Sequence, residues 1–532
     1  MSRLWCAVLA VALSSSAFAR TPDGAGTGDD KKASDGARVK SLEELNADLE
    51  AQKIELDAQK AQIQALLEAK KPAMSLAGTG VVPEPQDKKE MPDVKSKWNL
   101  TVYGFVEADF IEDSKQEGTS DTFGNALLIP GHGTYPTEHN QLTFGVRNSR
   151  IGFNGSAPEF AGFRPSAKLE MDFEGINGGA GVENNATWTN PTFRIRHMYL
   201  KLDSDAVTFT IGQGWELIGW QPYFMPDTVD IQGVAGEVYS RSPKFQVSHE
   251  FKGPVSIEIA AAASRPVERD SNTPDLQAGI KFSIPDWVGY HSIGAAGGSV
   301  DAAAIGISGC WRGFRVPRPV GAVGGPGQVD DSARATGDAA CLDIFLPILH
   351  PDKESRANSL SLTAETLYGK GINDLYTGFT GGAAAVAGIA DGGFVGWDHQ
   401  QLKAIQWRTT MLGLQYYLPG DGNWWVALNY SACKSDNMSK MATAPYAIGA
   451  VTPIATSFGG PNGTNAFKAS QWLNANLFWD VTPAVRVGMS LDQYRDTYAG
   501  AANPASAILF LGNPLSKEVR ETHFEVSVFY IF

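Results

Sequence analysis

Residues 523–532 read HFEVSVFYIF, a stretch in which one face of an extended chain would be wholly apolar. The residues that share this face are Phe524, Val526, Val528, Tyr530 and Phe532. Polar residues open the opposite face, at His523, Glu525 and Ser527. Because successive side chains of a β-strand point to opposite sides, the pattern predicts a strand with one apolar face.

The same alternation returns in residues 168–174, 276–284 and 484–492. These segments are about ten residues long and are divided by Gly, Pro, Asn and Asp, as in antiparallel sheets. A single strand of a soluble sandwich would show the same alternation. Other features must therefore decide between a soluble and a membrane-embedded sheet.

Three features favour the membrane. Residues 1–19 combine a basic start, an apolar stretch and a small-residue cleavage motif, which predicts a signal peptide. Residues 523–532 resemble the last-strand signature that the outer-membrane assembly machinery of bacteria recognises. Aromatic residues also gather near the expected strand ends, which predicts girdles at the membrane interfaces. These residues are Trp98, Tyr103, Tyr416, Tyr417, Trp424 and Trp425.

A sheet in lipid has to close, because an unpaired backbone group costs several kcal/mol there. At roughly 27 residues for each strand with its connection, residues 98–532 supply about 16 strands. A barrel of this width leaves an aqueous lumen. The predicted fold is therefore an all-β, antiparallel transmembrane β-barrel, preceded by an N-terminal α-helical coiled coil.

The coiled coil is expected at residues 41–71, between a disordered spacer at 20–40 and a Pro-rich linker at 72–97. A capping box opens it, and apolar residues then recur with a seven-residue period. The core positions expected to drive oligomerisation are Leu42, Leu45, Leu49, Leu56, Ile63 and Leu66. A single solvated helix is the alternative. The heptad itself does not choose between a dimer and a trimer.

Several segments resemble Gram-negative porins, and in particular the DcaP-like trimeric porin family. They are residues 98–109 (WNLTVYGFVEAD), 146–155 (VRNSRIGFNG), 194–199 (RIRHMY), 211–215 (IGQGW), 225–233 (MPDTVDIQG) and 239–249 (YSRSPKFQVSH). The resemblance implies a 16-stranded trimer, an inserted constriction loop, and passage of small solutes, often anions or dicarboxylates. Residues 214–241, which lack alternation, occupy the place of that loop. Gly/Ala/Pro-rich insertions near 321–340, 377–396 and 442–465 depart from the family pattern.

Charged side chains on the polar strand faces are the candidate pore residues, since a charge facing lipid costs about 2–4 kcal/mol at the bilayer midplane. They are Arg150, Arg194, Arg196, Arg241, Arg265, Arg486, Glu170, Asp172 and Glu174. Arg194 and Arg196 could form a basic ladder that steers anions, or could pair internally with the carboxylates. Because Met198 continues the arginine face, a bulge near His197 must switch the alternation.

The sequence offers no catalytic motif, no metal-ligand spacing and no cofactor fingerprint, so neither an enzyme nor a bound cofactor is expected. Calcium at the acidic trio Glu170, Asp172 and Glu174 is a weaker alternative to wall lining. Cys310 and Cys341 either close one exposed loop as a disulfide or remain free thiols. A net charge of −14 without a basic tract argues against nucleic acid as a partner. That charge does not by itself suggest an anion channel.

These observations predict a trimeric outer-membrane porin, with its coiled coil in the periplasm, for passive diffusion of small hydrophilic solutes. Its other expected partners are outer-membrane lipid, the barrel-assembly machinery and, through the coiled coil, the cell wall. The alternative is a structural or adhesive barrel tethered through the coiled coil. Specific uptake of one bulky ligand is a third possibility, and it predicts saturable block of conductance.

Overall fold

The computed structural model describes residues 99–115, 139–175, 192–229, 236–266, 271–292, 298–317, 332–350, 355–376, 394–441, 466–499 and 518–532. All of them belong to one compact unit, Glu90–Phe532. The predicted signal peptide, spacer, coiled coil and linker lie outside the described residues, so these expectations stay predictions. Among the described residues, no helix is both long and apolar enough to cross a membrane.

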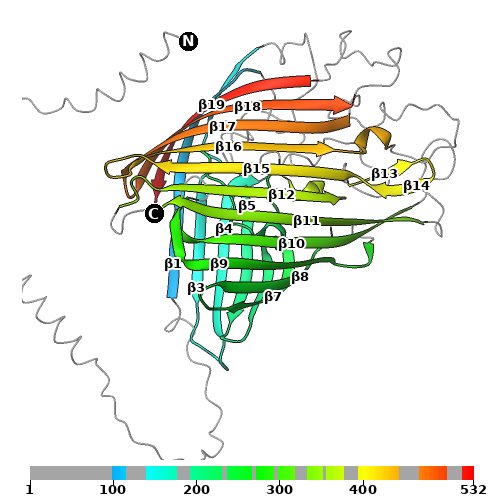
Figure 1. Ribbon diagram of the computed structural model, residues 1–532, viewed down its shortest axis with the longest axis horizontal. Helices are drawn as coiled ribbons and strands as arrows, with labels where there is room; N and C mark the ends of the chain where they lie inside the picture. Colours follow the sequence, from blue (N-terminus) through cyan, green and yellow to red (C-terminus); the bar gives the residue numbers. More distant parts are fainter. Residues whose placement is uncertain are drawn as a thin grey trace, which may run out of the picture. The chain divides into compact units, whose positions relative to one another are not determined.

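Seventeen antiparallel strands form one sheet in the described part of the chain (Figure 1). The first nine are β1 (Asn99–Asp113), β2 (Gln141–Gly145), β3 (Arg150–Ser156), β4 (Arg164–Gly175), β5 (Thr192–Asp203), β6 (Thr208–Trp215), β7 (Arg241–Phe251), β8 (Ser256–Ser264) and β9 (Asp275–His291). The others are β10 (Ser299–Pro317), β11 (Ser332–Leu349), β12 (Leu360–Lys370), β15 (Gln406–Tyr417), β16 (Trp424–Ser435), β17 (Ala466–Thr482), β18 (Val485–Ala499) and β19 (Glu518–Ile531).

Five short elements of the described residues lie outside the ring or in its connections. β13 (Val395–Asp398) and β14 (Gln401–Ala404) form a separate hairpin. The apolar side chains of this hairpin pack on those of β10 and β11. The described connections also hold three single-turn 3-10 helices, η4 (Ile218–Trp220), η6 (Asn373–Leu375) and η7 (Met438–Lys440).

The sheet closes on itself between its first and last strands. β1 pairs with β19 on one side and with β2 and β3 on the other, so β2 and β3 are two pieces of one broken strand. The ring therefore has sixteen strand positions, which confirms the predicted number. At the seam, Gly104 and Phe532 exchange two backbone hydrogen bonds of 3.0 Å. Closure satisfies the edge groups that an open sheet would leave unpaired.

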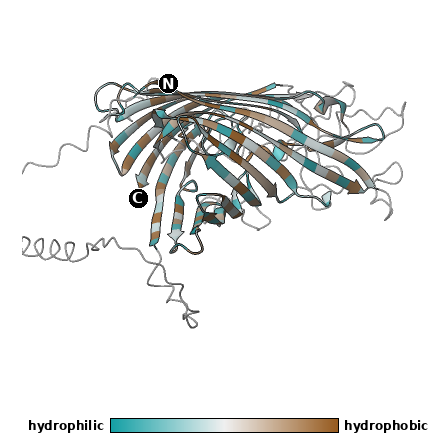
Figure 2. Cartoon of the chain, turned by 60° about the horizontal axis from the view of Figure 1, so that its bottom comes forward, coloured by the Kyte–Doolittle hydropathy of each residue, from teal (hydrophilic) through white to brown (hydrophobic). Residues whose placement is uncertain are grey.

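Apolar and polar residues alternate along the strands, as Figure 2 shows. Large apolar side chains stay exposed on the outer face of nearly every strand. Examples are Leu100, Phe144, Ile195, Ile211, Phe245, Ile259, Leu276, Ile305, Leu342, Leu412, Leu428, Leu473, Leu491 and Val528. The intervening polar side chains face inward and are buried. This pattern is the reverse of a soluble protein and is the one that lipid around a barrel requires.

Strand β5 carries the bulge that the sequence predicted near His197. Glu170 of β4 lies opposite His197 and Met171 lies opposite Ile195, so Arg196 has no partner in the register. One extra residue resets the alternation of a strand. Arg194, Arg196 and His197 consequently all face inward, while Met198 beyond the bulge is exposed on the outer face.

Three expectations from the sequence need correction. Residues 332–340 were expected within an insertion but form the first half of β11, where small side chains still pair with β10. Cys310 and Cys341 lie within β10 and β11 as free, buried thiols, so the disulfide alternative is wrong.

The aromatic girdle is only partly as expected. Trp424 stacks on Trp479 at 5.1 Å between ring centroids on the outer face. Tyr417 and Trp425 are instead buried, and the Tyr103 hydroxyl donates to Glu170 at 2.8 Å. Neighbouring residues of one strand cannot both face the lipid.

Candidate functional site

The connection between β6 and β7 lies inside the barrel. We call residues 216–240 the inserted segment; the structure describes 216–229 and 236–240 of it. The backbone N–H groups of Leu217 and Ile218 donate to Gln277 Oε1 of β9, at 2.8 and 3.0 Å. Gly219 N donates to Ser308 Oγ of β10 at 2.9 Å. Inward-facing side chains of the wall thus hold the start of the segment.

The inserted segment continues to the far wall. The Asn429 side-chain amide of β16 donates to the Asp227 carbonyl at 2.8 Å, and Val229 N donates to Asn476 Oδ1 of β17 at 3.0 Å. In the ring of sixteen positions, β16 stands eight positions from β6. The segment therefore crosses the whole lumen.

The returning part of the segment is held just as closely. Val238 N donates to Glu365 Oε1 of β12 at 2.7 Å, and Tyr239 N donates to the Leu375 carbonyl at 2.7 Å. Gly236 has a φ of +97°, and a Cβ there would lie 2.7 Å from the Ala432 carbonyl oxygen of the wall. Only glycine fits this close approach.

The arginines of β5 pair with carboxylates of β4. Arg194 donates twice to Asp172, at 2.9 and 2.6 Å. Arg196 donates to Glu170 at 2.8 Å, to Asp172 at 3.0 Å and to the Tyr239 hydroxyl at 3.1 Å. The internal pairing considered for these arginines therefore occurs, and Tyr239 ties it to the inserted segment.

Further cations surround the same two carboxylates. Lys168 Nζ lies 3.4 Å and Arg150 Nε 3.8 Å from Glu170. Arg241, at the start of β7, stacks over Trp215 at 4.5 Å and over Tyr239 at 5.1 Å. We call Arg150, Lys168, Arg194, Arg196 and Arg241 the basic cluster. The cluster contains five positive charges, whereas Glu170 and Asp172 supply two negative charges.

The members of the basic cluster differ in how much of each side chain is exposed to the lumen. The side chains of Arg194, Lys168 and Arg150 are 30%, 28% and 23% exposed, whereas that of Arg196 is 2% exposed. The first three can meet a solute in the lumen. Arg196 acts mainly inside the wall, because a buried guanidinium is stabilised by its paired carboxylates.

Three predicted pore residues lie apart from the basic cluster or at its margin. Glu174 pairs with Arg147 at 3.2 Å beside the cluster. Arg486 pairs with Asp480 at 2.6 Å and stacks over aromatic rings of β16 and β17. Arg265 is exposed just beyond the end of β8.

A cavity of about 390 Å³ lies between the inserted segment and the wall of β6 to β10. Its wall side presents Trp215, Lys244, Gln246, Glu258, Lys281 and Asp301, and its segment side includes Glu216, Trp220 and Tyr223. Lys281 pairs with Glu258 at 2.9 Å and lies 4.6 Å from the centre of the Tyr223 ring. Charged and aromatic groups thus face each other across a solute-sized space.

Sequence reasoning did not single out Lys244 and Lys281 as pore residues. Both lie on the polar face of an alternating strand, which was the signal available for them. Their role in the cavity depends on the inserted segment, which places Trp220 and Tyr223 opposite them. The alternation within a strand cannot predict which residues of the inserted segment will contact it.

Known proteins resemble the chain in structure only. No protein-family model matches the chain, and no curated protein matches it. The crystal structure of the outer membrane channel DcaP of Acinetobacter baumannii aligns with 82% of this chain and 98% of its own, with a TM-score of 0.54 and 17% identity. The barrel has the DcaP channel fold. The porin-type fold expected from the sequence is thus confirmed.

Other outer-membrane proteins align at lower scores than DcaP. OmpT of Vibrio cholerae, in its trimer form, covers 82% of this chain and 100% of its own, with a TM-score of 0.43 and 10% identity. OprB of Pseudomonas putida covers 82% and 95%, with a TM-score of 0.44 and 10% identity. The shared DcaP fold does not specify a solute, so selectivity has to be inferred from the lumen of this chain.

Proposed function

We propose that the chain forms a passive channel in the bacterial outer membrane, through which small hydrophilic solutes diffuse under filtering by size and charge. One observation carries the proposal. The inserted segment crosses the lumen from β6 to β16 and leaves a cavity of about 390 Å³ beside the wall. A polar cavity of this size accommodates small solutes and excludes larger ones. Flux would follow the solute gradient and needs no cofactor.

The outer face supports the membrane location. Leu100, Phe144, Leu473 and Val528 are each about half exposed, at 65%, 64%, 57% and 48%. Such a surface is unfavourable in water and stable in lipid, because burial of apolar area contributes about 25 cal/mol per Å². The closed ring also leaves no strand edge to the hydrocarbon.

The accessible charges favour anions, including dicarboxylates. Arg194 and Lys168 expose 30% and 28% of their side chains, whereas the inward carboxylates Glu107, Asp109 and Glu525 are at most 3% exposed. At the basic cluster a solute therefore meets the positive groups at closer range, whereas in the cavity the exposed carboxylate of Glu258 is paired with Lys281. Two cations on the same wall suit a solute with two carboxylates, since each carboxylate can then pair separately.

The assembly proposed from the sequence completes the function. The heptad of residues 41–71 would hold three barrels together in the periplasm, where it can also contact the cell wall. The outward face of β19, which ends at Phe532, would present the signal for the barrel-assembly machinery. Both parts rest on the sequence pattern and on the porin resemblance.

Single-channel conductance in a planar bilayer, with the reversal potential under a salt gradient, tests the proposal. Stepwise openings in threes with an anion-selective reversal potential would support a trimeric anion channel. Cation selectivity would remove the anionic-solute inference and keep the channel. Silence from folded, heat-modifiable protein would refute conduction and favour the structural or adhesive barrel.

A further inference from the structure

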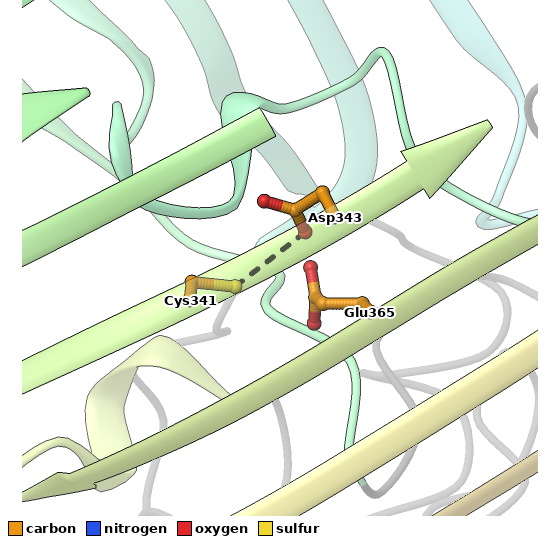
Figure 3. A group of neighbouring side chains, drawn as sticks. All are labelled: Cys341, Asp343 and Glu365. Carbon is orange, nitrogen blue, oxygen red and sulfur yellow. Dashed lines mark hydrogen bonds between the residues drawn. The ribbon is translucent and has the colours of Figure 1, made fainter. Parts of the chain in front are cut away.

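Three inward-facing acids gather beneath the inserted segment, apart from the basic cluster. Cys341 and Asp343 lie on β11 and Glu365 on β12 (Figure 3). The three are 2%, 0% and 3% exposed. One ligand atom from each lies within 4.8 Å of the other two. The set combines one sulfur and two carboxylate oxygens.

The cluster is held together by protons. The Cys341 thiol donates to Asp343 Oδ1 at 3.4 Å. An oxygen of Asp343 and one of Glu365 lie within 4.8 Å of each other, and two buried carboxyl groups this close favour holding one proton between them. Glu365 further accepts the Val238 N–H at 2.7 Å. Two removable protons therefore sit among three potential metal ligands.

Two observations separate this cluster from an ordinary buried acid pair. Asp343 is fully buried, yet its Oδ2 atom has no hydrogen-bond partner. Figure 3 shows one oxygen of the Asp343 carboxyl group, the one bonded to Cys341, turned also toward Glu365. Moreover, no ion pair among the described residues joins Asp343 or Glu365 to a Lys, Arg or His, whereas Glu170 and Asp172 have several such partners.

We propose that Cys341, Asp343 and Glu365 form a three-ligand site for a thiophilic divalent cation of the zinc class. A zinc ion has Zn–S bonds of about 2.3 Å and Zn–O bonds of about 2.0–2.2 Å, so at a tetrahedral angle sulfur and oxygen stand about 3.5–3.7 Å apart. The observed distance of 3.4 Å between Cys341 Sγ and Asp343 Oδ1 matches this edge. The sulfur ligand disfavours calcium and magnesium, which prefer oxygen alone.

Proton balance makes the exchange feasible in a buried place. The thiol and the shared carboxyl proton leave the cluster with one negative charge. A divalent cation that replaces both protons leaves a thiolate, two carboxylates and two positive charges, so the net charge stays at minus one. Binding therefore releases two protons and adds no net buried charge. The bound ion would join β11 to β12 beside the anchor of the inserted segment.

Cobalt(II) is the probe, because zinc has no absorption of its own and cobalt occupies zinc sites. Wild-type barrel folded in detergent should develop a thiolate-to-cobalt charge-transfer band on titration. Zinc should abolish the band, and weakly buffered solution should gain two protons per ion bound. Absence of the band in wild-type protein would refute the site.

Variants assign the ligands. Cys341→Ser should lose the charge-transfer band, and Asp343→Asn or Glu365→Gln should weaken cobalt binding about tenfold or more. Cys433→Ser is the matched control, since it removes a buried, free thiol of β16 and should keep the band. Heat-modifiable gel mobility checks that each variant is folded. A band that persists in Cys341→Ser, or disappears in Cys433→Ser, overturns the assignment.

Discussion

Replacing Arg194 with glutamine should weaken anion preference while the barrel stays folded. Arg194 exposes 30% of its side chain to the lumen and pairs with Asp172 at 2.6 Å. Asp172 keeps a second partner when Arg194 is removed, because Arg196 lies 3.0 Å away. The substitution therefore removes an accessible charge without leaving a buried carboxylate unpaired.

The size of the effect follows from Coulomb's law. A unit charge about 6 Å from a passing anion contributes about 0.7 kcal/mol in water and about 3 kcal/mol at an effective dielectric constant of 20. Asp172 cancels part of this field and solvent screens the rest, so the lower value applies. About 0.7 kcal/mol corresponds to a threefold loss for the anion; because the same charge repels cations equally, the anion-to-cation permeability ratio should fall about tenfold. Arg194→Glu should lower that ratio further.

Reversal potentials measured in one salt gradient compare the variants. Arg408→Gln is the matched control, because Arg408 also pairs with an aspartate, Asp436 at 2.5 Å, but lies on the outer face. The control should keep the wild-type potential. Equal shifts in Arg194→Gln and Arg408→Gln, or no shift in either, would refute the assignment of Arg194 to the conducting path.

Three further substitutions test the buried ion-pair network, the inserted segment and the assembly signal. Arg196→Gln removes buried hydrogen bonds, but Asp172 keeps Arg194 and Glu170 keeps Lys168, so it should lower the free energy of unfolding by about 1.5–3 kcal/mol, read from the urea midpoint; an unchanged midpoint contradicts this role. Gly236→Val should push the inserted segment from the Ala432 carbonyl, which a Cβ would approach to 2.7 Å, and so alter single-channel conductance; wild-type conductance would disprove the close contact. Phe532→Ala keeps both backbone bonds to Gly104 and should reduce barrel assembly in cells but not refolding in detergent; normal assembly in cells would remove the signal role.

The barrel wall could be predicted from the sequence because the alternation within each strand shows which of its faces meets lipid. Alternation at 168–174 and 484–492 predicted the inward carboxylates and the outward apolar residues. The interruption between Arg196 and Met198 even predicted the bulge of β5. Residues 332–340 were misjudged because alanine and glycine fit a strand and a loop equally well.

The lumen was harder to predict because its contacts join distant parts of the chain. Val238 meets Glu365, and Asp227 meets Asn429, across more than a hundred residues of sequence. The grouping of Cys341 with Glu365 depends on the register between β11 and β12, in which Cys341 lies opposite Leu367. The polar face of each strand can be recognised from its own sequence. Which polar residues of different strands contact each other can be determined only from the closed barrel.

The path of the inserted segment has a mechanical consequence. A chain that leaves β6, is anchored at β9 and β10 and reaches β16 and β17 works as a strut across the lumen. The sheet's circumference depends on strand number and register, but the free passage depends on where the strut divides the cross-section. Substitutions within the inserted segment can therefore change the size and charge of the passage without changing the strands of the barrel.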